Sequence, residues 1–133
     1  MIYCLSTLPP SNNALFVKVG KATYKTYEYN AWIAKAMQEV KRYPPFHAEK
    51  FACDIMVPWW SHRNRGDIHN YAKAVIDLFV RAKLIKDDKH CICATIGYVI
   101  STTSGKIEVE FRSSDEHFAD MQEYAEQHKD NSK

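Results

Sequence analysis

The chain of 133 residues is long enough for one domain with a hydrophobic core, and 46% hydrophobic residues is typical of a globular protein. No apolar run approaches the ~20 residues of a membrane helix, and the N-terminus has no basic region ahead of an apolar stretch, so we expect a cytosolic protein without a membrane partner. A net charge of +2 does not by itself indicate nucleic acid, although a local basic face can still attract phosphates.

The first third of the chain predicts short strands followed by a helix. We expect strands at residues 2–8 and 14–19, separated by a turn at Pro9–Asn13, and then a mobile basic loop over residues 20–23. From Thr26 the apolar residues recur at helical spacing, and the helix should end before Pro44 because proline cannot continue it. Thr26 is the expected N-cap.

The rest of the chain alternates strands and helices. Apolar alternation predicts a strand over residues 51–57, and an apolar stripe predicts a core helix over residues 68–83. A strand over residues 91–100 should pass through a hairpin turn at 102–105 into a strand at 107–111. Ser113 and Glu116 resemble a capping box for a last helix, whose apolar stripe is Phe118, Met121 and Tyr124 or Ala125.

These elements predict a single α+β domain over residues 1–133, with a mixed or mostly antiparallel sheet and helices packed on it. Residues 128–133 form a polar tail that we expect to be frayed. The four cysteines lack metal-ligand spacing, so we expect buried, reduced thiols. Trp59-Trp60 could stack on nucleobases, but a tryptophan pair at a strand end is more often core or interface.

The stretch from Arg63 to Lys73 places cations, a carboxylate, an imidazole and an amine at the start of the predicted core helix. Backbone amides at a helix N-terminus favour anions, and Lys73 shares a helical face with His69 four residues earlier. Asp87 and Asp88 follow the helix, but a helix of about sixteen residues is ~24 Å long. Spacing alone therefore does not bring Asp88 to Asp67.

Each of these residues also has a simpler interpretation. Asp67 can be only a helix N-cap, His69 an exposed polar residue, and Asp87-Asp88-Lys89 a solvated turn. If the carboxylates do converge, their oxygens suit Mg²⁺ or Mn²⁺, and such a metal can activate water against a phosphodiester. Arg63 and Arg65 would then hold flanking phosphates.

At these residues the chain resembles the RusA family of Holliday junction resolvases, small homodimeric endonucleases of bacteria and their phages. The strongest match is Arg65-Gly66-Asp67-Ile68-His69-Asn70-Tyr71-Ala72-Lys73, followed by Asp77 and then Asp87-Asp88. The family pattern is R-x-D-x-D-N-x-x-K, a helix with a further aspartate, and a D-D pair at the same spacing. Pro9-Pro10-Ser11-Asn12-Asn13 looks like the family's Pro-Pro-Ser-x-Asn signature, and Tyr27–Trp32 resembles the start of its first helix.

The resemblance implies a RusA-like homodimer that nicks a four-way DNA junction symmetrically with Mg²⁺, or Mn²⁺, in recombination and repair. It implies catalytic roles for Asp67, His69, Lys73 and Asp88, with Asp87 as a further metal-binding candidate beside Asp67, His69 and Asp88. It also implies that the fold returns Asp88 to Asp67. The expected DNA contacts are Lys18, Lys21, Lys25, Arg63, Arg65, Asn13 and Asn70.

His69 departs from the family pattern, which has a second aspartate there. Imidazole is a poorer ligand than carboxylate for Mg²⁺ and a better one for Mn²⁺, and it can also act as a general base. Two alternatives therefore remain beside the working resolvase. One is a junction-binding or architectural protein with weakened catalysis, and the other is a nuclease for other branched DNA.

Overall fold

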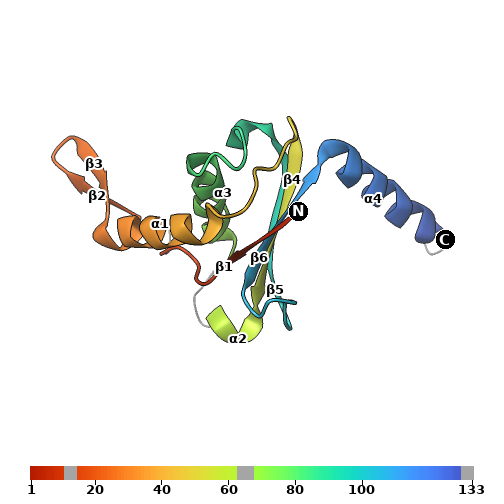
Figure 1. Ribbon diagram of the computed structural model, residues 1–133, viewed down its shortest axis with the longest axis horizontal. Helices are drawn as coiled ribbons and strands as arrows, with labels where there is room; N and C mark the ends of the chain where they lie inside the picture. Colours follow the sequence, from red (N-terminus) through yellow and green to blue (C-terminus); the bar gives the residue numbers. More distant parts are fainter. Residues whose placement is uncertain (11–14, 63–67, 130–133) are drawn as a thin grey trace.

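The protein builds its core from a four-stranded mixed sheet with two helices on one face (Figure 1). The computed structural model describes residues 1–10, 15–62 and 68–129. The sheet contains β1 (Ile2–Leu5), β4 (Phe51–Pro58), β5 (Cys91–Val99) and β6 (Ile107–Ser113), in the order β1-β6-β4-β5. β4 is antiparallel to β6 and parallel to β5, which confirms the predicted α+β class and a mixed sheet.

One predicted connection is wrong. The turn at residues 102–105 does not join paired strands, because β4 lies between β5 and β6. The apolar alternation of both strands was correct, but alternation does not identify which neighbour a strand pairs with. β4 is buried along most of its length because it is an inner strand, with Phe51, Cys53, Ile55 and Val57 all at 1% exposure or less.

Helices α1 (Tyr27–Val40) and α3 (Ala72–Arg81) cover the same face of the sheet. α1 begins where the sequence predicts, because the Thr26 hydroxyl accepts a hydrogen bond from the Tyr29 backbone N–H at 3.2 Å. The predicted helix over 68–83 is shorter and divided: residues Ile68–Tyr71 form a 3₁₀ turn, η2, and α3 follows.

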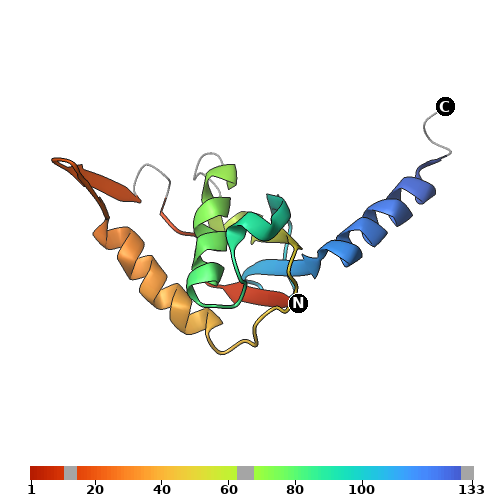
Figure 2. The same cartoon turned by 90° about the horizontal axis from the view of Figure 1, so that it is seen from above.

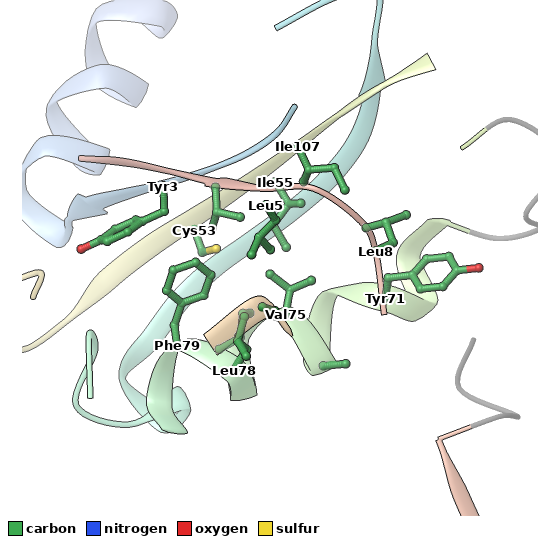
Figure 3. Packing of buried hydrophobic residues seen from close by; sticks show 14 of the residues in the cluster. Tyr3, Leu5, Leu8, Cys53, Ile55, Tyr71, Val75, Leu78, Phe79 and Ile107 are labelled. Atoms are coloured by element: carbon green, nitrogen blue, oxygen red, sulfur yellow. The ribbon is translucent and has the colours of Figure 1, made fainter. Parts of the chain in front are cut away.

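The core lies between α3 and the sheet, and Figure 3 shows its side chains at close range. The Phe79 ring meets Tyr3 and Phe111 edge-on, with ring centroids 5.1 Å apart in each pair. Val75 points from the same helix toward Leu5 and Ile55 (Figure 3). Burying each such side chain contributes roughly 1.5–3 kcal/mol, so α3 is firmly held against the strands.

Two short elements complete this part of the chain. α2 (Trp59–His62) follows β4, and η3 (Asp88–His90) precedes β5.

The prediction of buried thiols is right for Cys53 and wrong for Cys4, Cys91 and Cys93, which are partly exposed. All four cysteines are free.

The loop predicted at residues 20–23 is instead the tip of a β-hairpin formed by β2 (Phe16–Val19) and β3 (Ala22–Lys25). Gly20 has a φ of 63°, the left-handed conformation that a two-residue hairpin turn needs. The hairpin projects from the N-terminal end of α1, at one extremity of the molecule (Figure 2).

At the other extremity, α4 (Ser114–Gln127) extends away from the sheet (Figures 1 and 2). The predicted cap is confirmed, since the Ser113 hydroxyl accepts from the Glu116 backbone N–H at 3.2 Å. α4 ends at Gln127, directly before the tail that we expect to be frayed. Residues 130–133 of that tail lie outside the described residues. Among the described residues, no helix has the length and apolar character needed to cross a membrane.

Candidate functional site

Lys73 and Asp88 border one pocket of ≈ 370 Å³ between α3 and the start of β5. The other lining residues are apolar or weakly polar: Ala72, Ile76, Cys91, Ile92, Cys93 and Ala94. Lys73 stands in the first turn of α3, and Asp88 opens η3. The pocket therefore brings together an amine from the start of α3 and a carboxylate from η3, which follows α3 in the chain.

The return of Asp88 depends on the turn that ends α3. Lys83 adopts a left-handed backbone with φ 60°, which is unusual for a residue with a side chain. The backbone N–H groups of Leu84 and Ile85 both donate to the carbonyl of Phe79, at 3.0 and 3.4 Å. Because Leu84 and Ile85 are also buried, the chain is pulled back along α3 rather than continuing past its end.

Asp87 has a structural contact of its own. Its side chain caps η3 by accepting a hydrogen bond from the Lys89 backbone N–H at 3.1 Å, and the ammonium of Lys89 lies 4.0 Å from its second oxygen. The backbone hydrogen bond from Lys89 lowers the pKa of Asp87, so this carboxylate stays ionised well into the acid range. Asp88, the next residue, is exposed at the pocket edge.

Asp77 was not among the sequence-predicted site residues, although it follows Lys73 by one helical turn. It lines a second pocket of ≈ 230 Å³ with Lys25, Tyr29 and Arg81, where the base of the hairpin meets α1 and α3. Burial raises the pKa of Asp77, the Asp88 carboxylate raises it further, and the cations Lys73 and Lys25 oppose both effects. Asp77 thus lies within electrostatic reach of the hairpin and of the Lys73–Asp88 pocket. The spacing i, i+4 from Lys73 was the signal that could have identified it.

The thiols at the pocket are a second feature that the sequence did not reveal. Cys91 and Cys93 line it, and the Cys91 thiol donates to the Cys93 carbonyl at 3.4 Å. Burial raises the pKa of Cys91, so its thiol stays protonated at neutral pH. Among the described lining residues Asp88 supplies the carboxylate oxygens, which suit a hard ion such as Mg²⁺.

His69 and Asn70 are both exposed on η2, directly before α3. Four of the predicted site residues, Asp67, Arg63, Arg65 and Asn13, lie outside the described residues. Within the described ranges, no three His, Cys, Asp or Glu side chains are grouped closely enough to hold a metal ion. Asp67, which directly precedes η2 in the sequence, stays a predicted ligand.

The hairpin places two of the predicted DNA contacts on one face. Lys18 lies opposite Thr23 and Lys25 opposite Phe16 in the β2–β3 register, and directly opposed residues share a face. All three lysines of this region are exposed, and Lys21 occupies the turn. Val17, Val19, Ala22 and Tyr24 form the other face, so the hairpin has one basic and one apolar side.

Trp59 and Trp60 are 53% and 61% exposed, which excludes a core position within one chain for either residue. Trp59 meets the ring of Tyr98 edge-on at 4.9 Å between centroids, so it is held at the C-terminal ends of β4 and β5.

Comparison with known families gives one match. The family model described as endodeoxyribonuclease RusA matches residues 7–112, which cover β2 to β6 and the whole Lys73–Asp88 pocket and end before α4. No curated protein matches the chain.

Proposed function

Because the chain belongs to the RusA endodeoxyribonuclease family, whose members resolve Holliday junctions, we propose that it is a divalent-metal-dependent resolvase that cuts four-way DNA junctions by paired symmetric nicks. The observation that carries the proposal is the pocket shared by Lys73 and Asp88. These two residues match the family's catalytic lysine and third acidic residue. The proposal places the enzyme with its DNA in the cytoplasm of a bacterium or a phage-infected cell.

The proposed metal ligands are Asp67, His69 and Asp88. Asp87 would act mainly by capping η3, and this cap would orient the neighbouring Asp88. When bound, Mg²⁺ or Mn²⁺ would polarise the scissile phosphate and lower the pKa of the attacking water. The exposed carboxylate of Asp88 suits an oxygen-ligated ion. His69 adds an imidazole, which shifts the expected preference toward Mn²⁺.

The protein's own groups would supply position and charge. The Lys73 ammonium offsets the negative charge that builds on the phosphate oxygens in the transition state. The Lys73 ammonium opposes the rise in the pKa of Asp77, one turn along α3, so the two side chains lie within electrostatic reach of each other. Asn70 would orient a ligand or a phosphate beside the same turn of helix.

The DNA backbone would run from this pocket to the basic face of the hairpin. Lys18, Lys21 and Lys25 would supply the hairpin contacts, and Arg63, Arg65 and Asn13 are the further proposed contacts to the DNA backbone. Such contacts read the shape of a branched duplex rather than its sequence. A two-fold homodimer would present two equivalent pockets to opposing strands of the junction, which is itself two-fold symmetric.

A synthetic four-way junction with Mg²⁺ or Mn²⁺ tests the proposal. We expect symmetric nicks from the wild type and a loss of at least ~100-fold in Lys73→Met and Asp88→Asn, with junction binding retained. Lys41→Met is the matched control, because Lys41 is an exposed lysine at the C-terminal end of α1. His69→Asp should retain activity and shift the preference toward Mg²⁺.

Three results would count against it. Undiminished nicking in both Lys73→Met and Asp88→Asn would place the chemistry elsewhere. Binding without nicking under either ion would favour an architectural protein whose catalysis has weakened at His69. Faster cutting of flaps than of four-way junctions would favour a nuclease for other branched DNA.

A further inference from the structure

α4 carries an apolar stripe that nothing within the described part of the chain covers. Phe118, Met121 and Tyr124 are 59%, 55% and 64% exposed, and His117 is the buried residue of the helix. These positions recur at helical spacing on one side, so the stripe continues the face that contacts the sheet at His117. An exposed apolar patch on a fixed element marks a contact surface.

The helix is fixed at its base by Arg112. The guanidinium donates to Asp54 at 2.9 Å and to Asp120 at 2.7 Å, and it lies 3.1 Å from His117 Nδ1. These bonds tie β4 and β6 to the second turn of α4. α4 is therefore held on the side of the sheet away from α1 and α3 (Figure 1).

The charge of α4 restricts what can cover it. The helix contains no lysine or arginine, and its acidic residues are Asp115, Glu116, Asp120, Glu123 and Glu126. This charge repels nucleic acid, and it also disfavours pairing of two α4 helices with each other. A partner for the stripe should be apolar with basic residues beside it.

The β2–β3 hairpin has this chemistry. On its apolar face, Val17, Val19 and Tyr24 are 47%, 62% and 57% exposed. Residues 15–25 contain no acidic residue, and of their three lysines Lys21, in the turn, adjoins this face, while Lys18 and Lys25 lie on the opposite face. A lone two-stranded hairpin is marginally stable in water, so covering this face would also stabilise it.

We infer that the apolar stripe of α4 packs against the apolar face of the β2–β3 hairpin of a second copy of this chain. The two elements project from opposite extremities of one molecule, so they cannot meet within it (Figures 1 and 2). A reciprocal exchange closes a two-fold dimer in which both contacts form. Lys18 and Lys25, on the other face of the hairpin, stay free for DNA.

This inference rests on the proposed homodimer for its partner and adds which surfaces meet. α4 lies beyond residues 7–112, so the contact uses a segment outside the family match. The apolar residues of the stripe and the acidic residues beside them all lie within residues 114–127.

Light scattering coupled to gel filtration tests the contact through variants of each of its two surfaces, the α4 stripe and the hairpin. The wild type should elute at twice the 15.4 kDa of one chain. Met121→Lys places a cation in the stripe, and we expect its dimer dissociation constant to rise at least ~100-fold, or ~2.8 kcal/mol at 1.4 kcal/mol per tenfold, because both symmetric contacts are lost. Ala119→Lys adds the same charge to the opposite side of α4 and should stay dimeric. Tyr24→Lys and Thr23→Lys form the matching pair on the hairpin.

A mixing experiment identifies the contact directly. Val19→Cys chains and size-tagged Met121→Cys chains, mixed and oxidised mildly with a copper–phenanthroline reagent, should give the mixed disulfide. Each variant alone, carrying the four native thiols, gives the background. A monomeric wild type, a dimer that persists in Met121→Lys, or cross-linking of Met121→Cys to itself would overturn the inference. The nicking activity of Asp88→Asn tests the proposed function and not this contact, because Asp88 lies in neither α4 nor the hairpin.

Discussion

Replacing Arg112 with methionine tests how α4 is held, and the bonds of Arg112 give the expected magnitude. Methionine keeps an unbranched stem in place and removes the guanidinium. The bond to Asp54 joins side chains only 19% and 27% exposed, and a charged hydrogen bond in such a place contributes about 1.5 kcal/mol. The Asp120 carboxylate is 57% exposed, so water screens this ion pair and its share is about 0.5 kcal/mol. We expect Arg112→Met to lower the free energy of unfolding by about 2 kcal/mol.

Urea denaturation at a fixed protein concentration measures this change, and the melting temperature should fall by about 6–10 °C. Asp120→Asn should cost about 0.5 kcal/mol in the wild type and nothing in Arg112→Met, since the ion pair is already lost. Amide hydrogen exchange should accelerate along α4 more than along β4, because α4 loses its anchor while the sheet keeps its core. Lys106→Met, an exposed lysine just before β6, is the control. A change below about 0.5 kcal/mol in Arg112→Met, or unaltered exchange in α4, would refute the reasoning.

Three further outcomes follow from other contacts. Thr26→Ala removes the cap of α1 and should cost about 1 kcal/mol in thermal unfolding, while Thr26→Ser, which keeps the hydroxyl, should not. Burial raises the pKa of Asp77, so its ionised form is disfavoured in the folded state. Asp77→Asn should therefore increase stability at pH 7, and this gain should vanish as pH falls below the unfolded-state pKa of ~3.9, where the carboxyl becomes protonated in both states. Urea titrations between pH ~3 and ~8 check this, and a gain independent of pH would contradict it. Lys18→Ala should reduce the slope of log binding constant against log salt by about 0.9 on junction DNA, and Lys41→Ala should not.

The elements that the sequence predicts well are those with local signals. Thr26 and Ser113 cap their helices as predicted, because a hydroxyl three residues before a free backbone N–H needs no distant partner. The strand pairing of β5 and β6 was wrong for the opposite reason. Their neighbour is chosen by the burial of β4 between them, and that choice depends on residues some forty positions away.

The hairpin was predicted only in part: its first strand falls within the strand expected over residues 14–19, and its second strand, β3, was not predicted. A strand this short, with both faces exposed, carries no burial pattern to distinguish it from a loop. Gly20 was the informative residue, since its positive φ permits the tight turn. The exposure of the α4 stripe could not be predicted either, because helical spacing shows that apolar residues share a side and does not show what covers it.

The convergence of Lys73 and Asp88 shows where sequence spacing stops being informative. Helix length alone separates them, and the separation is overcome by two features after α3: the left-handed backbone at Lys83 and the burial of Leu84 and Ile85 near Phe79. Neither has a strong sequence signal, because lysine rarely adopts positive φ and two apolar residues can as well extend a helix. The resemblance implied that Asp88 returns toward Asp67, which lies outside the described residues, and it gave no physical cause for that return. It follows that the position of Asp88 beside Lys73 should depend on Leu84 and Ile85, which lie outside the pocket, as much as on the residues that line it.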